Sequence, residues 1–332
     1  MLRRFILAFI FALSATGLPA LAQEKPELTI YTYDAFAAEW GPAGSLKTGF
    51  EAFCDCVLTF VSADSSIGAL RRAQIEGKNT KADIILGLDT ASIGMARATG
   101  LFVPHAVDTS ALAVPTNWSS GDFVPFDYGY LAFVYNKEKL AHPPGSFEDL
   151  IAGDLKIILQ DPRSSTPGLS LVLWIKTLYG DKAGDIWSDL ASNIVTVTPD
   201  WSTAYALFLK NEADLVLSYT TSPAYHAIAE GDHRFAAAEF ASGHYMQIEV
   251  AGILKSSPHQ NLANTFLTYL ISPQAQQFIP HANWTYPVAI LESGTPEGFG
   301  KLIQPDPVLI LPEEIVTKNN RAWIEEMLSA IR

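Results

Sequence analysis

The chain has 332 residues and a formal net charge of −13, and 48% of its residues are hydrophobic. This length favours two lobes over one, because single hydrophobic cores stop growing at about 250 to 300 residues. The negative charge argues against nucleic acid as a partner, since a protein that binds polyanions normally has a basic face. Any recognition of phosphate must therefore be local.

The first residues have the pattern of an export signal. Residues 1–4 (MLRR) are followed by an apolar stretch over 5–13 and by the small residues of 20–22 (ALA). This order is typical of a secretory signal peptide and predicts cleavage after Ala22. No later stretch has enough uninterrupted apolar residues to cross a bilayer. We therefore expect a soluble mature chain that begins at Gln23 and lies outside the cytoplasm, in the periplasm.

The two cysteines, Cys54 and Cys56, are separated by one residue. An exported chain permits a disulfide between them. However, this spacing on an extended strand would hold the Cα atoms near the upper limit for bridging. We favour the disulfide, and two reduced thiols stay open. No His or second Cys pair lies at ligand spacing, so zinc is not expected.

Short apolar strands alternate with helices in the first part of the mature chain. Strands are predicted over 28–33, 57–62 and 82–87, and a capped helix over 67–76 ends at Gly77. This repetition predicts a mainly parallel, doubly wound α/β sheet, in which ligands bind outside the carboxyl ends of the strands. The residues expected around this crevice are Tyr33, Asp64, Ser65, Ser66 and Asp89.

A long aromatic run over residues 123–135 lacks helical periodicity and predicts an extended crossover into a second lobe. The polar and apolar alternation of residues 243–250 predicts the strand that returns to the first lobe. Between the crossovers, strands are predicted over 157–159, 194–198 and 214–219, and helices over 147–151, 169–179, 183–191 and 203–210. After them we expect helices over 258–270 and 273–278 and an amphipathic helix over 312–331, which Asn319 and Asn320 could interrupt.

The loop at residues 160–168 (QDPRSSTPG) joins a predicted strand to a predicted helix. Its hydroxyls and free backbone N–H groups at a helix N-terminus suit a phosphate or another compact anion. Alternatively, Ser164 or Ser165 simply caps the helix and Pro167 occupies its first turn. The loop by itself leaves both interpretations open.

Four long segments of the chain are distinctive: residues 28–34 (LTIYTYD), 123–130 (FVPFDYGY), 160–168 (QDPRSSTPG) and 217–225 (LSYTTSPAY). Together they resemble the periplasmic thiamine-binding proteins of bacterial ABC importers. The segments occur in the family's order, and the resemblance covers nearly all of the mature chain. It implies a type II periplasmic-binding-protein fold, in which crossover strands join two doubly wound lobes and a ligand cleft lies between them.

The resemblance also implies a domain organisation and a role. Residues 1–22 would be the signal peptide, 23–126 and 247–332 the two parts of lobe 1, and 127–246 lobe 2, with the C-terminal helix able to pack on lobe 2. The protein would capture thiamine (vitamin B1), or its monophosphate or diphosphate, and deliver it to an inner-membrane ABC permease. Thiamine would be the transported ligand, and no cofactor, metal or catalytic residue is expected.

The family's site residues can be carried over by position. On the phosphate side they fall on Ser165, Thr166, Trp201, Tyr219, Thr220, Thr221 and Ser222. Around the rings they fall on Tyr33, Trp40, Tyr225 and Trp284. One departure is Ser65-Ser66, which replaces the family's Asp-Gly, with Asp64 displaced by one position; this leaves the roles of Asp64 and of the two hydroxyls open.

Each of these features also has a purely structural interpretation. The aromatic residues could belong to the core, although a cation over an aromatic face would gain about 0.5 to 2 kcal/mol. Asp89 and Asp127 could balance the thiazolium charge or could bond nearby amides in turns; we favour the turn for Asp127 and leave Asp89 open. Arg163 could bind a phosphate or pair with Asp161.

Three other functions share this fold. A thiaminase I-like enzyme needs a cysteine nucleophile, but Asp55 between Cys54 and Cys56 would raise the pKa of a thiol instead of lowering it. Ferric-iron receptors typically use neighbouring tyrosines, and the sequence has no Tyr-Tyr pair. A polyamine receptor would need several convergent carboxylates. We therefore prefer a thiamine receptor that is not an enzyme.

Overall fold

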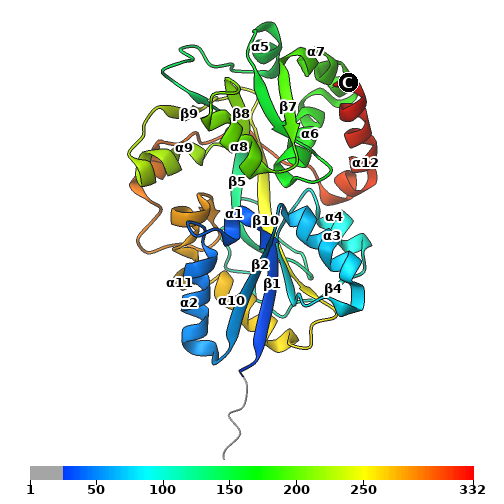
Figure 1. The fold of residues 1–332 in the computed structure, drawn as a ribbon, viewed down its shortest axis with the longest axis vertical. Helices are drawn as coiled ribbons and strands as arrows, with labels where there is room; N and C mark the ends of the chain where they lie inside the picture. Colours follow the sequence, from blue (N-terminus) through cyan, green and yellow to red (C-terminus); the bar gives the residue numbers. More distant parts are fainter. Residues whose placement is uncertain (1–24) are drawn as a thin grey trace, which may run out of the picture.

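The computed structural model describes residues 25–332, so the predicted signal peptide and the cleavage after Ala22 lie outside the described residues. Two lobes are stacked along the long axis of the molecule, and two long strands run between them (Figure 1). Within residues 25–332, no helix is both long and apolar enough to span a membrane.

Lobe 1 is a doubly wound α/β layer. Its parallel strands are β1 (Glu27–Tyr33), β2 (Val57–Ala63) and β3 (Ile84–Asp89). Its helices are α1 (Asp34–Ala37), α2 (Ala43–Cys54), α3 (Ser66–Glu76), α4 (Ile93–Ala98), α10 (Gln260–Leu270) and α11 (Pro273–Gln276). Its short strands, β4 (Phe102–Val103) and β11 (Tyr286–Pro287), pair with the two long strands that run between the lobes.

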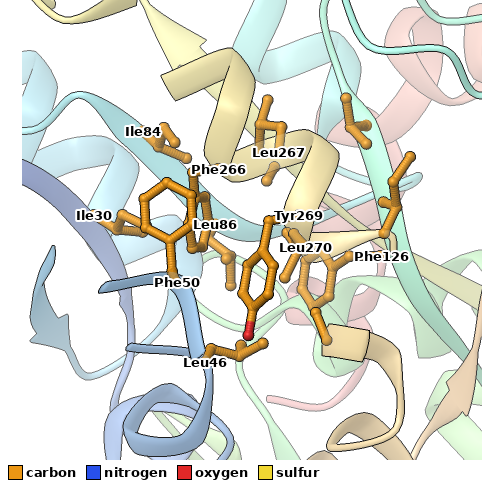
Figure 2. Close-up of a cluster of buried hydrophobic side chains, with 14 of the residues drawn as sticks. Ile30, Leu46, Phe50, Ile84, Leu86, Phe126, Phe266, Leu267, Tyr269 and Leu270 are labelled. Atoms are coloured by element: carbon orange, nitrogen blue, oxygen red, sulfur yellow. The ribbon is translucent and has the colours of Figure 1, made fainter. Parts of the chain in front are cut away.

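The sheet of lobe 1 buries both of its faces, which is why its strands are apolar at successive positions. Ile30 packs with Phe50 of α2 and Phe266 of α10 on one face, as Figure 2 shows. The next residue along β1, Tyr31, packs with Leu70 of α3 on the other face. The predicted strands and the helix that Gly77 ends are confirmed here.

The crossovers are β5 (Val124–Asn136) and β10 (His244–Leu254), and both are nearly fully buried. They lie side by side in one continuous sheet whose order is β2-β1-β3-β10-β5-β8-β6-β7. The main strands of each lobe are parallel to one another as predicted, but β10 is antiparallel to β3 and to β5, and β5 is antiparallel to β8. The sheet is therefore mixed at its centre, because strands that leave and re-enter a lobe run in opposite directions.

Lobe 2 repeats the doubly wound arrangement. Its strands are β6 (Ile157–Gln160), β7 (Ile194–Thr198), β8 (Leu215–Tyr219) and β9 (Phe235–Ala237). Its helices are α5 (Phe147–Ala152), α6 (Thr166–Tyr179), α7 (Ala183–Leu190), α8 (Trp201–Leu209) and α9 (Ser222–Tyr225). Its core is built around large aromatic side chains, among them Trp174, Trp187 and Phe133, which are all buried.

The last helix, α12 (Glu313–Ala330), follows the short strand β12 (Val308–Leu309). It continues without interruption through Asn319 and Asn320. The apolar side predicted for this helix is only partly buried: Met327 is buried, together with Val316, whereas Ile315 is exposed. The helix packs against α6 and α7 of lobe 2 and against α4 of lobe 1, so it spans both lobes.

The disulfide is present between Cys54 and Cys56, with a Cα–Cα distance of 5.2 Å. This distance is within the normal range for a bridge and below the upper limit expected for an extended strand. The reason is local: Cys54 ends α2, and Asp55 has a left-handed backbone with φ of 48° that brings the two cysteines together. No free cysteine remains among the described residues.

Candidate functional site

A cavity of about 390 Å³ lies between the two lobes. The ends of β1 and β8, the starts of α3, α6 and α8, and the crossovers β5 and β10 all contribute to its walls. This is the expected place for a ligand, because side chains at strand ends and helix N-termini converge there. The predicted residues that line it are Tyr33, Trp40, Asp64, Ser65, Ser66, Ser165, Thr166, Trp201, Tyr219, Ser222, Tyr225 and Trp284.

Four predicted residues do not line the cavity. Thr220 and Thr221 are buried beneath the turn that follows β8, where the N–H of Thr220 donates to the carbonyl of Tyr130 at 2.8 Å. Asp89 is buried behind the cavity, where its carboxylate accepts hydrogen bonds from the N–H of Ser92 at 3.0 Å and from the Ser170 hydroxyl at 3.3 Å. None of these three residues lines the cavity, and the buried hydroxyls of Thr220 and Thr221 have no hydrogen-bond partner within the described residues.

Arg163 is the fourth of these residues, and it is exposed outside the cavity. Its Nε donates to Oδ1 of Asp161 at 2.9 Å, so the structural ion pair is confirmed and the role in phosphate binding has no geometric support. The backbone carbonyl of Arg163 accepts a hydrogen bond from Arg71 of α3 at 2.8 Å. Arg163 thus takes part in a contact between the lobes.

The loop before α6 leaves hydroxyls free to face the cavity. Ser165 occupies the N-cap position but makes no side-chain cap hydrogen bond, while Pro167 lies in the first turn as predicted. The hydroxyl of Ser164 donates to the carbonyl of Pro199 at 2.6 Å. Gly168 allows a close approach of the loop to β6, because a Cβ there would lie 2.4 Å from the carbonyl oxygen of Gln160.

On the lobe 1 side, the start of α3 is built differently. The Ser65 hydroxyl accepts a hydrogen bond from the N–H of Gly68 at 3.0 Å and caps the helix. Ser66 is the first residue of α3, is buried and lines the cavity. The two hydroxyl-bearing helix starts therefore face the same cavity from opposite lobes.

The helix predicted over 203–210 begins two residues earlier in the structure, so Trp201 lies in the first turn of α8 and not in the loop before it. Asp200 caps this helix through a 2.6 Å hydrogen bond from the N–H of Thr203. The indole N–H of Trp201 donates to the Ser218 hydroxyl at 2.9 Å. Its ring stacks on Tyr205 with ring centroids 4.8 Å apart and an interplanar angle of 24°. Trp201 is thereby held in one orientation at the cavity wall.

The other aromatic residues come from separate segments. Trp284 lies edge to face with Tyr225, with ring centroids 5.5 Å apart. Its backbone has φ of 58°, in the left-handed region that a bulky residue rarely adopts. Trp40 is 52% exposed at the cavity. The arrangement offers flat apolar faces from both lobes.

The floor of the cavity carries two buried carboxyl groups, Asp127 of β5 and Glu249 of β10. Burial raises the pKa of Asp127 to about 7. Burial, together with the charge of Asp127, raises the pKa of Glu249 well above its usual value. The turn that we favoured for Asp127 from the sequence is wrong, because this residue lies within a crossover strand.

Asp34 and Asp64 also line the cavity, so four carboxyl groups face it, and no Lys, Arg or His side chain of the described residues does. The carboxylate of Asp34 accepts a hydrogen bond from the Ser202 hydroxyl at 3.2 Å, which joins the lobes. Burial raises the pKa of Asp34. A cavity of this composition suits a cation that also has flat apolar surfaces.

Several lining residues were missed from the sequence. They are Asp34, Ala35, Gly129, Pro167, Ser202, Tyr205, Ala206, Leu209, Gln247, Glu249, Asn283 and Thr285. A usable signal existed for Gln247 and Glu249, because polar side chains in a fully buried strand normally have a function or a partner. No comparable signal marks Ala206 or Leu209.

The residues that the structure describes contain no cluster of three or more His, Cys, Asp or Glu side chains placed to hold a metal ion. The thiols of Cys54 and Cys56 are consumed in the disulfide, which lies at the end of α2 and not in the cavity. The cavity therefore offers binding groups, and neither cysteine is available there as a nucleophile.

Comparison with known proteins places the chain in a family. Residues 26–277 match the family model described as bacterial extracellular solute-binding protein. The chain is 49% identical to the thiamine-binding periplasmic protein of Salmonella typhimurium, over 94% of this chain and 95% of that protein.

Solved structures agree with this match. A structure titled periplasmic thiamin binding protein superimposes with a TM-score of 0.90 at 49% identity, covering 93% of this chain and 97% of the other. A ferric binding protein from Campylobacter jejuni has the same fold, with a TM-score of 0.75 at 17% identity over 91% of this chain and 99% of that one. The chain therefore belongs to the thiamine-binding periplasmic proteins, a group within the bacterial extracellular solute-binding protein family.

Proposed function

We propose that this protein captures thiamine in the cavity between its lobes, in the periplasm, and delivers it to an ABC import permease in the inner membrane. It acts as a receptor and not as an enzyme, and thiamine is its cargo and not a cofactor. One observation carries the proposal: aromatic faces and four carboxyl groups line the cavity, with no basic side chain among them. The names of relatives at 49% identity support the same ligand.

Thiamine has a flat aminopyrimidine ring and a thiazolium ring with a permanent positive charge. The charge cannot be removed by loss of a proton, so its desolvation must be offset by aromatic faces or carboxylates. Trp284 and Tyr225 offer faces near one end of the cavity, and Trp201 offers one from lobe 2. We assign the ring contacts to these residues together with Tyr33 and Trp40.

The hydroxyethyl group of thiamine, or a phosphate on it, would face the helix starts. The N-terminus of α6, with Ser165 and Thr166, supplies amide and hydroxyl donors, and the start of α3 at Ser66 supplies more from lobe 1. Helix N-termini can bind one phosphate without a basic side chain. We therefore expect the monophosphate to bind about as tightly as thiamine, within roughly tenfold. The diphosphate should bind no more tightly than the monophosphate, because its further charge would approach Asp34 and Asp64.

A polyamine is the second candidate, because the four lining carboxyl groups would also suit several ammonium groups. The aromatic walls favour thiamine, since a polyamine has no flat ring to place against them. The likeness to a ferric binding protein at 17% identity concerns the fold alone.

Calorimetry on the purified mature protein tests these assignments. Thiamine, its monophosphate, its diphosphate, spermidine and a ferric chelate are titrated separately at one pH and salt concentration. We expect thiamine and the monophosphate to bind with submicromolar dissociation constants, and spermidine and iron to give no heat of binding. Tight binding of spermidine or iron together with no binding of thiamine would overturn the proposal. If thiamine were instead consumed in the presence of an added nucleophile, the protein would be an enzyme of the thiaminase I type.

A further inference from the structure

Asp127 and Glu249 face each other on the crossover strands that join the lobes. They are directly paired in the antiparallel register of β5 and β10. Asp127 is fully buried, Glu249 is 8% exposed, and both line the cavity. Two carboxyl groups thus meet at the floor of the site, where water has little access.

The hydrogen-bond donors around this pair are all neutral. The Tyr33 hydroxyl donates to Oε2 of Glu249 at 2.8 Å. Oδ2 of Asp127 accepts from Nδ2 of Asn283 at 2.6 Å and from the Thr285 hydroxyl at 2.9 Å. The other oxygen of Asp127, Oδ1, is buried and has no hydrogen-bond partner within residues 25–332. The protein therefore supplies neutral donors to both carboxyl groups and leaves one oxygen of Asp127 without a partner.

No positive charge balances the pair from the elements packed against it. From β3, Asp89 lies opposite Glu249 in the register and adds a further acidic group. From β1 and β8 come Tyr33 and Tyr219, whose pKa values burial raises well above the usual tyrosine value, so both are neutral. Two carboxyl groups close together in a buried site without a positive charge cannot both ionise easily, so the pair keeps one shared proton near neutral pH.

A permanent cation changes this balance. When a quaternary nitrogen enters the cavity, the second negative charge of the pair is offset by the ligand, and the shared proton becomes unnecessary. This step balances in charge. Before it, the pair holds one proton beside the cation; after it, both carboxyl groups are ionised beside the cation, and the proton has passed to solvent.

We propose that Asp127 and Glu249 are the counter-charge for the thiazolium ring and that binding of thiamine releases a proton from this pair. The inference rests on the proposed function and adds to it a specificity determinant and a pH dependence. Because burial raises the pKa values of both carboxyl groups, the ligand-free pair holds the proton that binding releases, and affinity rises with pH. We expect thiamine to bind at least about tenfold more tightly at pH 8 than at pH 5.

Calorimetry in two buffers of different ionisation enthalpy measures the proton directly. At pH 6.5, titration of thiamine in PIPES and in Bis-Tris should show release of about half to one proton per thiamine bound. The analogue in which a neutral thiophene replaces the thiazolium ring should bind at least tenfold more weakly and release no proton. This comparison needs no altered protein, so it does not depend on whether a variant folds.

The variants Glu249→Gln and Asp127→Asn should abolish the proton release and flatten the dependence of affinity on pH. Glu325→Gln, at a largely exposed carboxyl on α12, is the matched control and should behave as wild type. Thiamine that binds without proton exchange, or equal proton release with the neutral analogue, would overturn this inference and leave the proposed function standing. No thiamine binding at any pH would overturn both.

Discussion

Trp284 is the residue whose removal tests the aromatic part of the site most directly. It lines the cavity and lies edge to face with Tyr225. Trp284→Ala should weaken thiamine binding about twofold to thirtyfold, because an aromatic face over a cation contributes about 0.5 to 2 kcal/mol. Calorimetry measures the change, with Trp323→Ala of α12, outside the cavity, as the control. Unchanged affinity in Trp284→Ala would contradict the stacking model.

Ionisation of the buried Asp89 carboxyl should lower the stability of the folded protein by an amount that depends on pH. It is fully buried, and burial raises its pKa to about 7 despite hydrogen bonds from Ser92 and Ser170. Because the folded state holds this proton more tightly than the unfolded state, stability falls as pH rises from about 4 to about 7. Asp89→Asn should remove up to about 4 kcal/mol of this penalty at pH 8 and have little effect at pH 4.

Urea unfolding of wild type and Asp89→Asn at pH 4, 6 and 8 measures this difference. Asp108→Asn, at an exposed carboxyl whose pKa is lowered by hydrogen bonds from Ser110, serves as the control. If Asp89→Asn is destabilised equally at every pH, then the carboxylate is needed for its hydrogen bonds and carries no penalty from burial.

Helices and strands whose formation depends on residues close together in the sequence were predictable from the sequence. The strands of both lobes and the helix that begins at Ser65 and ends at Gly77 follow from apolar runs, a capping hydroxyl and a terminating glycine. The start of α8 was misplaced because Asp200, its cap, was taken as part of a loop. Helix starts are fixed by such single side chains, so one misjudged cap moves Trp201 from a helix into a loop.

Pairing between distant strands was not predictable in the same way. Asp127 and Glu249 meet only because β5 and β10 are antiparallel neighbours in a specific register. A single residue of slip would turn Glu249 to the other face of the sheet. The resemblance of segments identified residues on the walls of the cavity, such as Ser165 and Trp201, but it did not identify the carboxyl groups on its floor.

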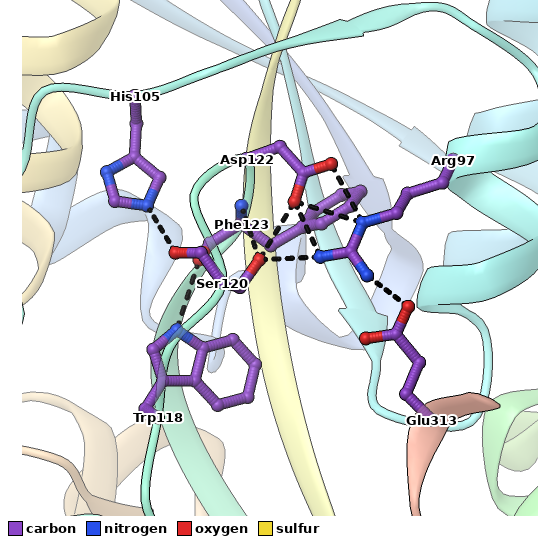
Figure 3. A network of polar contacts seen from close by, with 7 residues as sticks. All are labelled: Arg97, His105, Trp118, Ser120, Asp122, Phe123 and Glu313. Carbon is purple, nitrogen blue, oxygen red and sulfur yellow. Dashed lines mark hydrogen bonds and ion pairs between the residues drawn. The ribbon is translucent and has the colours of Figure 1, made fainter.

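The start of α12 is tied to lobe 1 by Arg97 of α4 (Figure 3). The guanidinium donates to Asp122 at 2.7 and 2.9 Å and to the Ser120 hydroxyl at 2.9 Å, and it pairs with Glu313. One side chain thus joins α4, the segment before β5 and the first turn of α12. Its partly exposed ion pairs are screened, but the network has good geometry.

Arg97→Ala should therefore lower the melting temperature by about 2 °C or more, which corresponds to roughly 1 kcal/mol of stability. Arg321→Ala, which removes an exposed pair with Glu325 on the same helix, should change the melting temperature little. Differential scanning calorimetry compares the two. Equal shifts would mean that the network around Arg97 contributes no more than an isolated surface pair.

At the scale of the whole molecule, the lobes touch across the cavity. Arg71 of α3 reaches the carbonyl of Arg163 at 2.8 Å, and the Ser202 hydroxyl reaches Asp34 at 3.2 Å. The crossovers β5 and β10 and the helix α12 connect the lobes elsewhere. Binding proteins with two lobes open and close about such connections, and contacts across the mouth form only on closure.

These contacts predict that the rate at which thiamine leaves depends on a residue that need not touch it. Arg71→Ala should speed dissociation about threefold to tenfold and leave association nearly unchanged, because a hydrogen bond from a charged donor is lost only from the closed state. Its neighbour Arg72 pairs with Glu76 within lobe 1, so Arg72→Ala is a control on the same helix. Stopped-flow tryptophan fluorescence gives both rates. A slower association with unchanged dissociation in Arg71→Ala would show that Arg71 guides entry of the ligand and does not hold the lobes closed.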